Sequence, residues 1–451
     1  MSPEQRTTGG GSLSRLLSRI APIEPRELPA VAAAFALFFF VLGGYFAVRP
    51  VRETVGTLLG RERVADLFLA TWIASLIIVP LYGAVVARFR RSLFLPWIYG
   101  SIALALALVG IALHGNEGNV AVGQFFYVFI SVLNLFVVSV FWSFLLELFD
   151  SGQTKRLFGV IAAGGTAGAL IGPLVTDLTA EHIGSSGVLF LGAGAFVAAI
   201  VCQRALLAIW TGKPAAQGDA QTAPAAAAGR DRPIGGNPFA GFTLVLRSPY
   251  LLGIVLFVML LASANTFLYF EQLRLVNETF ADTNERTRIF ARIDWIVQSL
   301  TIVSQVLITG RLASRLGVVV LVTFVPIVMI FGFLALAAMG TFAVLAVVMV
   351  LRRVGEYAFV RPGREMLFSR LDNETKYKAK NLIDVVVYRG ADALSAQVQN
   401  AIRAAGFGPV GVALGGVAIA ALWAINGWWL GRRHDMAQPA SASPGTVSGR
   451  G

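Results

Sequence analysis

The chain has 451 residues, of which 56% are hydrophobic and only 14% are charged. Soluble domains carry about 25% charged residues, so this composition excludes a soluble globular protein. The net charge of +12 would suit nucleic-acid binding, but the arginines lie in short stretches between apolar runs and not along one polar face. We therefore expect an all-α integral membrane protein that contacts the lipid bilayer and no nucleic acid.

Apolar runs long enough for membrane helices begin at Leu28 and recur through the first half of the chain. A spanning helix needs about 20 mainly apolar residues. We expect a cytoplasmic N-terminal segment at 1–27, followed by a six-helix bundle over 28–211. The helices of this bundle are predicted at 28–48, 64–87, 92–113, 120–149, 157–180 and 187–211.

A stretch rich in Ala, Gly, Pro and Gln then interrupts the pattern, and such a composition cannot form a packed core. We interpret 212–248 as a cytoplasmic linker. A second six-helix bundle is predicted over 249–430, which gives about twelve transmembrane helices, and 431–451 is predicted to be a disordered cytoplasmic tail. The helices of the second bundle are predicted at 249–270, 289–309, 316–338, 341–360, 380–404 and 408–430.

Basic residues gather in alternate loops, as the positive-inside rule requires of cytoplasmic loops. This pattern places both termini and the linker in the cytoplasm. The loops after the first and seventh predicted helices break the rule, and their charges need another explanation. Those arginines are Arg49, Arg52, Arg61, Arg63, Arg274, Arg286, Arg288 and Arg292.

The two halves of the chain resemble each other weakly. FDSGQTKRLFGVIAAGG at 149–165 corresponds in place and character to LDNETKYKAKNLIDVVVYRG at 371–390. Two six-helix halves joined by a cytoplasmic linker are typical of major facilitator carriers, whose substrate site lies near the midplane between the halves. We therefore expect a major-facilitator-like six-plus-six repeat.

The sharpest local pattern is VRPVRE at 48–53, which recurs as VRPGRE at 360–365. In each copy two arginines are three residues apart and would share one helical face. Guanidinium groups bind carboxylate or phosphate bidentately, so both pairs are candidates for anion binding. In the alternative interpretation, the prolines end helices and the arginines anchor to lipid headgroups or pair with nearby glutamates. The candidate residues are Arg49, Arg52, Arg361 and Arg364.

Several charged residues fall inside apolar segments, where insertion costs roughly 2.5 to 3.5 kcal/mol each. Such groups should line water or pair with one another. Arg389 is a candidate for substrate binding, although an ion pair with Asp392 three residues on would explain it equally well. Glu271 is a substrate or proton-coupling candidate. The remaining coupling or ion-pair candidates are Glu147, Glu356, Asp384 and Asp392.

Gly164, Gly168 and Gly172 form a GxxxGxxxG stripe, which favours close packing of helices. Enzymatic motifs are absent: the three histidines have no HExxH spacing, and no GxxxxGK[ST] sequence occurs. With one cysteine, Cys202, neither an internal disulfide nor a cysteine-based metal site is available. We therefore expect no enzyme activity, no cofactor and no metal.

The chain resembles the ATP/ADP translocases, a family of nucleotide transporters, and especially their bacterial relatives. The likeness extends from about Val31 to Trp429 and is strongest in VRPVRETV, LFVVSVFWSFLLELFDSGQTKRLFGVIAAGG and RPGREMLFSRLDNETKYKAKNLIDVV. The resemblance implies nucleotide exchange in a bacterial cytoplasmic membrane. By position, it assigns transport roles to Arg52, Glu271 and Arg364, with Lys155 and Arg156 from the TKR triplet. Arg52 and Arg364 replace lysines of the family.

Three hypotheses follow. The first is an alternating-access carrier, functional as a monomer, that exchanges an organic anion such as a nucleotide or phosphorylated metabolite. The second is a proton-coupled exporter of a cationic or neutral compound, with Glu147, Glu271 and Asp384 as titrating groups. The third is a non-transporting membrane scaffold in which the charges only hold helices together.

Overall fold

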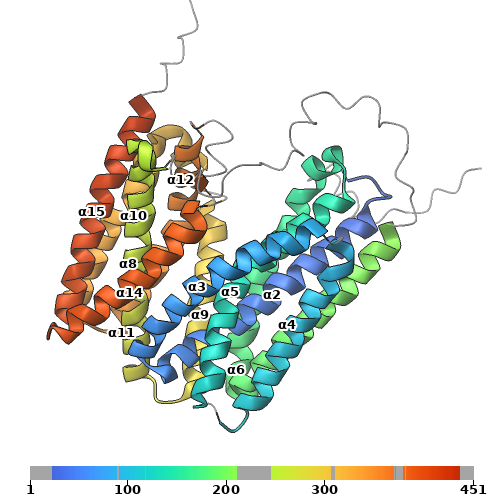
Figure 1. Cartoon of the computed structure of the whole chain (residues 1–451), viewed down its shortest axis with the longest axis horizontal. Coiled ribbons are helices and arrows are strands. Elements are labelled where there is room, and N and C mark those ends of the chain that lie inside the picture. The colour runs from blue at the N-terminus through green and yellow to red at the C-terminus, as the bar shows by residue number, and fades with distance from the viewer. Residues whose placement is uncertain are drawn as a thin grey trace, which may run out of the picture. The chain divides into compact units, whose positions relative to one another are not determined.

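The computed structural model describes residues 23–88, 91–116, 118–210, 245–305, 310–369, 371, 379–380 and 382–436. The regular secondary structure within these ranges is entirely helical (Figure 1). Internal contacts divide the chain into two compact units. Unit 1 holds the described residues within 1–55, 80–233 and 282–295, and unit 2 holds those within 56–79, 234–281 and 296–451. The predicted linker lies almost wholly outside the described residues.

The first part of the chain forms long helices that follow one another after short turns. The longest stretch, α6, is two helical arms that meet at Gly184, whose φ of 69° is readily adopted only by glycine. These arms correspond to the helices predicted at 157–180 and 187–211. The helices are α2 (Leu28–Leu59), α3 (Arg61–Arg88), α4 (Arg91–Leu113), α5 (Val120–Leu148) and α6 (Ser151–Trp210).

The second part begins with α8, whose N-cap Ser248 accepts a hydrogen bond from the Leu251 N–H and whose first turn contains Pro249. Two short π-helical segments, η2 and η3, interrupt the later helices. The elements are α8 (Pro249–Thr279), α9 (Thr283–Ser304), α10 (Gly310–Met339), α11 (Phe342–Gly355), η2 (Glu356–Val360), α12 (Arg361–Phe368), η3 (Leu382–Val387), α14 (Tyr388–Ala404) and α15 (Pro409–Met436).

The prediction that the first helix ends before Pro50 is wrong. Helix α2 continues through Pro50 to Leu59, and Gly60, with φ of +81°, terminates it. A proline removes one N–H donor, which a long membrane helix tolerates when its other backbone groups remain bonded. The Thr54 hydroxyl, for example, donates to the Pro50 carbonyl at 3.1 Å. Arg49 therefore lies within a helix and not in a loop.

Pro362 does not end its helix either. The η2 segment joins α11 to α12 directly, and the Arg361 N–H donates to the Glu356 carbonyl five residues earlier. Pro362 then falls in the first turn of α12, where its missing N–H costs little. Single π turns inside α-helices often mark functional sites, which directs attention to this segment.

In unit 1, the predicted packing role of the glycine stripe is confirmed. A Cβ atom added at Gly164, Gly168 or Gly172 would collide with the backbone carbonyl of Phe35, Phe39 or Gly43 of α2, respectively. Small residues let two helix backbones approach closely in a membrane, where hydrophobic burial alone does not hold helices together. The stripe thus fixes α6 against α2, the helix that carries VRPVRE.

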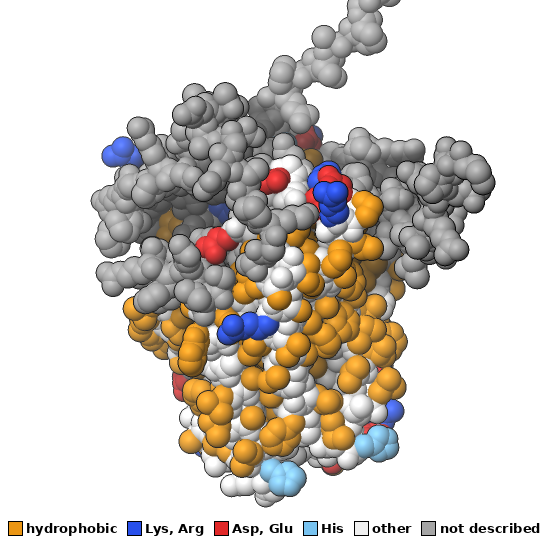
Figure 2. All heavy atoms as spheres, turned by 90° about the vertical axis from the view of Figure 1, so that its right-hand side faces the viewer, with side chains coloured by type: hydrophobic (Ala, Val, Ile, Leu, Met, Phe, Trp, Pro, Cys, Tyr) orange, Lys and Arg blue, Asp and Glu red, His pale blue; other side chains and the backbone are white. Residues whose placement is uncertain are grey.

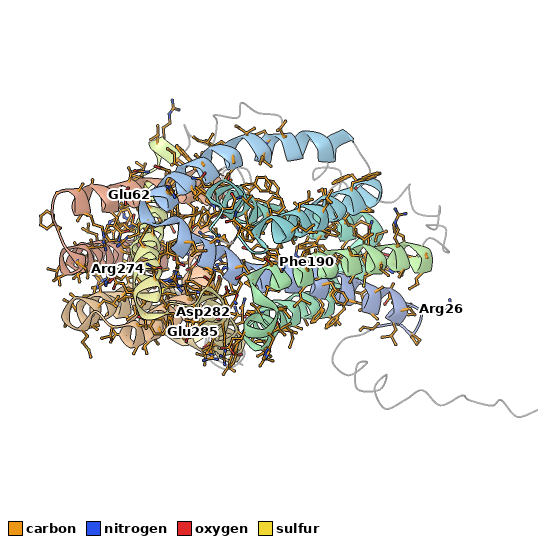
Figure 3. All side chains as sticks on the ribbon, turned by 90° about the horizontal axis from the view of Figure 1, so that it is seen from below. Arg26, Glu62, Phe190, Arg274, Asp282 and Glu285 are labelled. Atoms are coloured by element: carbon orange, nitrogen blue, oxygen red, sulfur yellow. The ribbon has the colours of Figure 1, made fainter. Side chains whose placement is uncertain are left out.

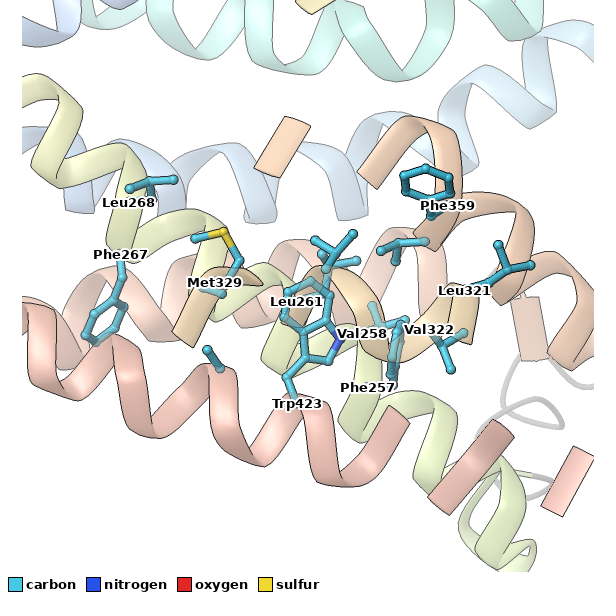
Figure 4. Close-up of a cluster of buried hydrophobic side chains, with 14 of the residues drawn as sticks. Phe257, Val258, Leu261, Phe267, Leu268, Leu321, Val322, Met329, Phe359 and Trp423 are labelled. Carbon is cyan, nitrogen blue, oxygen red and sulfur yellow. The ribbon is translucent and has the colours of Figure 1, made fainter. Parts of the chain in front are cut away.

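In unit 2, aromatic and branched side chains of α8, α10 and α15 form a buried core, with α10 packed along α15 (Figure 4). The indole of Trp423 packs edge-on against Phe257, with 5.7 Å between ring centroids, and both are fully buried. Phe359 of η2 packs against this core, so the π-helical segment is anchored to it.

The described surface is strongly apolar. Large side chains such as Trp97, Leu178 and Phe331 are 81%, 66% and 66% exposed, and hydrophobic side chains cover most of the described face in Figure 2. Soluble monomers rarely expose apolar surface on this scale. Seven helices in the described residues are long and apolar enough to cross a membrane. The protein is thus a multi-pass integral membrane protein, and the predicted total of about twelve spans stays a prediction.

Candidate substrate-binding site

The first arginine pair lies on α2 of unit 1 and faces nearby carboxylates. The Arg52 guanidinium contacts the Glu53 carboxylate at 2.5 Å and donates to the Ser131 hydroxyl at 3.1 Å. Arg49 lies 3.8 Å from Glu53 and also 3.8 Å from Asp294. Two arginines therefore face two buried carboxylates, so the ion pairs of this group, within the described part of the chain, balance in charge.

The second copy, in unit 2, is arranged around the buried carboxylate of Glu356, the first residue of η2. Arg352, one turn earlier on α11 and also buried, donates to Glu356 at 2.8 Å. The Arg361 guanidinium lies 3.7 Å from the other carboxylate oxygen and 4.4 Å from the centre of the Tyr357 ring. The side chain of Arg361 is 56% exposed, so one side of it is open to a ligand.

Arg364 extends this group toward η3. Its guanidinium lies 3.1 Å from the carboxylate of Asp384, and the two side chains are 14% and 31% exposed. The neighbouring Glu365 and Lys380 form a separate pair, 2.6 Å apart. VRPGRE and the polar start of the eleventh predicted helix are therefore brought together.

The ion pair between Arg389 and Asp392, one of the two interpretations of Arg389, is present, with 3.7 Å between their charged atoms. Asp392 also accepts a hydrogen bond from the Thr266 hydroxyl at 3.1 Å. Asp392 lies within electrostatic range of Glu356 and Arg352, which joins this pair to the same group. We call the group the η2 arginine cluster. Its ion pairs, among the described residues, link four arginines to three carboxylates: Arg352, Arg361, Arg364 and Arg389 with Glu356, Asp384 and Asp392.

Glu271, on α8 of unit 2, lies among other arginines. Its carboxylate pairs with Arg274 one turn later and lies 3.7 Å from Arg403 of α14. Arg274 also contacts Glu278 at 2.6 Å. The described structure therefore pairs Glu271 with arginines outside the two VRP motifs.

Two remaining candidates, Glu147 and Lys155, are not placed in either arginine group. Glu147 has an exposed side chain near the end of α5. The side chain of Lys155 lies outside the described part of the structure. Its neighbour Arg156 is held by the buried Glu27 at 3.0 Å. Within the described residues, no cluster of His, Cys, Asp or Glu could hold a metal ion.

Sequence reasoning missed Asp177, a buried aspartate of α6 in unit 1. It accepts hydrogen bonds from Trp295 at 2.9 Å and from Arg292 at 3.1 Å, and lies 3.4 Å from Arg288. The carboxylate of Asp177 therefore accounts for the positions of Arg288 and Arg292, two of the arginines that break the positive-inside rule. An aspartate inside the apolar run 157–180 was the available signal, but its partners lie more than 100 residues away.

Comparison with known proteins supports the fold. No protein-family model matches the sequence, and no curated protein is similar to it. A bacterial homologue of the iron transporter ferroportin has a TM-score of 0.62 at 15% identity, over 89% of this chain and 99% of that one. A bacterial homologue of the human lysosomal transporter Spinster scores 0.57 at 13% identity, covering 93% and 100%. The nucleoside transporter NupG scores 0.57 at 14% identity, covering 92% and 100%.

These structures share one architecture with the chain over nearly their whole lengths. The protein therefore has a major-facilitator-like fold. The resemblance to the ATP/ADP translocases is a finer assignment that rests on sequence motifs alone.

Proposed function

We propose that the protein is a secondary transporter that carries an organic anion by alternating access. The observation that carries this proposal is the η2 arginine cluster, in which, among the residues that the structure describes, four arginines share three carboxylates. An unbalanced positive charge in a low-dielectric setting is costly, and an anionic ligand would offset that cost.

Within the cluster, Arg361 and Arg364 are the residues we assign to substrate contact. Arg361 is 56% exposed and lies 3.7 Å from Glu356, whereas Arg352 is buried and donates to the same carboxylate at 2.8 Å. Arg364 pairs with the partly exposed Asp384, a carboxylate that substrate oxygens could replace. Charge-assisted bonds from guanidinium to phosphate or carboxylate are about twice as strong as neutral ones.

The substrate class we favour is a nucleotide or phosphorylated metabolite. This choice follows from the motif resemblance to the ATP/ADP translocases, in which Arg52, Glu271 and Arg364 match positions implicated in transport. Exchange follows if an empty, positively charged site resists reorientation until another anion occupies it. We further propose a six-plus-six helix repeat, a bacterial cytoplasmic membrane, cytoplasmic termini and a functional monomer.

The test is ligand-induced thermal stabilisation of the purified full-length protein with nucleotides, phosphorylated metabolites and organic acids. A ligand that binds only the folded state adds about 2.7 kcal/mol at a hundredfold excess over its dissociation constant. We expect a shift with a phosphorylated anion that is lost in Arg361→Gln and Arg364→Gln. Arg247→Gln, which changes an exposed arginine of unit 2, is the matched control and should retain the shift.

A transport assay separates this proposal from proton-coupled export. Uptake into proteoliposomes loaded with the same anion should fall strongly in Arg364→Gln. If a cationic or neutral compound is transported in a pH-dependent way, and this transport survives in both Arg361→Gln and Arg364→Gln, the result would instead favour the exporter. Absence of flux for every anion, with the protein folded, would contradict the proposal.

A further inference from the structure

A second group of arginines lies outside the proposed site, where the start of α3 meets α8 and α14 in unit 2. Arg61, the first residue of α3, lies over the Phe270 ring with 5.6 Å from its guanidinium carbon to the ring centre. Arg274 of α8 and Glu62, the residue after Arg61, are labelled in Figure 3. Arg403 of α14 lies within electrostatic range of Arg61.

The guanidinium of Arg61 has unusual surroundings. Its three nitrogens are all buried, and none has a hydrogen-bond partner in the described part of the protein. The Nε and Nη2 atoms of Arg403 are also buried without a hydrogen bond. A buried donor left unbonded costs about 1 to 3 kcal/mol, and more when it is charged. Several such donors lie together here, and a ligand that accepts hydrogen bonds from them would remove this cost.

The local charge supports the same conclusion. The two carboxylates near Arg61, Glu271 and Glu278, are already engaged by Arg274 in close ion pairs. Arg403 reaches Glu271 only at 3.7 Å, and Arg61 has no ion pair within 4 Å among the described residues. Within the described part of the protein, three arginines therefore share two carboxylates, which leaves an excess of one positive charge.

We propose that Arg61 and Arg403 bind a phosphate-type oxyanion that supplies the missing charge and hydrogen-bond acceptors. Several oxygen atoms on one anion can accept from two guanidinium groups at once, which a spherical ion does less well. Free phosphate and the phosphodiester of a lipid headgroup share this chemistry. The proposal does not depend on the transport function assigned to the η2 arginine cluster.

The test measures binding to the full-length protein in detergent, with gluconate as the background anion. The probes are inorganic phosphate, dioctanoyl phosphatidylglycerol and chloride. We expect phosphate or the lipid to raise the melting temperature of the wild type. In Arg61→Gln the affinity should fall at least about tenfold, because a charged donor is lost. Arg63→Gln, an exposed arginine two residues away, should bind as the wild type does.

The outcomes are distinct. Stabilisation by phosphate assigns a free anion, and stabilisation by the lipid alone assigns a headgroup. Equal stabilisation by chloride, or a phosphate effect that persists in Arg61→Gln, would overturn the proposal. If Arg61→Gln does not fold, Arg61→Lys keeps the charge and should still weaken binding, while equilibrium binding of radiolabelled phosphate to the wild type tests the site directly. Uptake by Arg364→Gln reports separately on the η2 arginine cluster.

Discussion

The two copies of the VRP motif share five of six residues but have different surroundings. In α2, Arg49 and Arg52 face Glu53 and Asp294, so each positive charge has a carboxylate nearby. In the second copy, the arginines after η2 belong to a cluster whose described residues include more arginines than carboxylates. The comparison teaches that residues outside the motif decide whether its arginines are balanced by carboxylates or carry excess positive charge.

The largest effect is expected from Glu356→Gln, which removes the carboxylate at the centre of the η2 arginine cluster. Arg352 would remain buried with its charge uncompensated, and breaking such a pair costs about 3 to 5 kcal/mol. We expect a large fall in melting temperature. The comparison variant in the first copy is Glu53→Gln. It should lower the melting temperature less, because Arg49 retains Asp294. Equal melting temperatures for Glu356→Gln and the wild type would contradict the central role of Glu356.

A smaller effect is expected from Arg52→Gln in the balanced copy. The change removes a charged hydrogen bond to Ser131 and an ion pair with Glu53, worth about 1.5 to 3 kcal/mol. Arg49 still lies near Glu53, which limits the loss. Chemical unfolding should therefore detect lower stability, while the affinity for an anion changes less than in Arg364→Gln. A larger affinity loss in Arg52→Gln would reverse the contrast between the copies.

The smallest effect is expected from Lys380→Gln, beside the unbalanced copy. Its pair with Glu365 is 33% and 47% exposed, and exposed pairs contribute about 0 to 1 kcal/mol. Stability and anion affinity should both stay close to those of the wild type. A strong loss of affinity would show that the anion site extends to Lys380.

Much of the architecture could be predicted from the sequence because membrane helices are defined locally by long apolar runs. The packing role of Gly164 and the pair between Arg389 and Asp392 were also predictable, since both depend on residues three or four positions apart. The helix boundary at Pro50 was predicted wrongly, because the rule that proline ends a helix in soluble proteins is relaxed in a membrane. The predicted boundary of 48 therefore fell well short of Leu59.

The partners of the arginines could be predicted only in part. Asp177 with Arg292, and Arg61 with Phe270, join segments more than 100 residues apart, and no local spacing connects them. The sequence showed that Arg61 and Arg292 break the positive-inside rule, without showing that Arg292 pairs with Asp177 and that Arg61 has no ion pair among the described residues. Tertiary packing alone distinguishes the two.

The π turn at Glu356–Val360 also determines in which direction about the helix axis the side chains of α12 point. Each residue of an α-helix advances the chain by about 100° around its axis. A turn closed by a bond over five residues holds one residue more than an α-helical turn, so it displaces the following side chains around the axis relative to a regular helix. The direction of Arg361 and Arg364 about the helix axis is consequently set by this π turn.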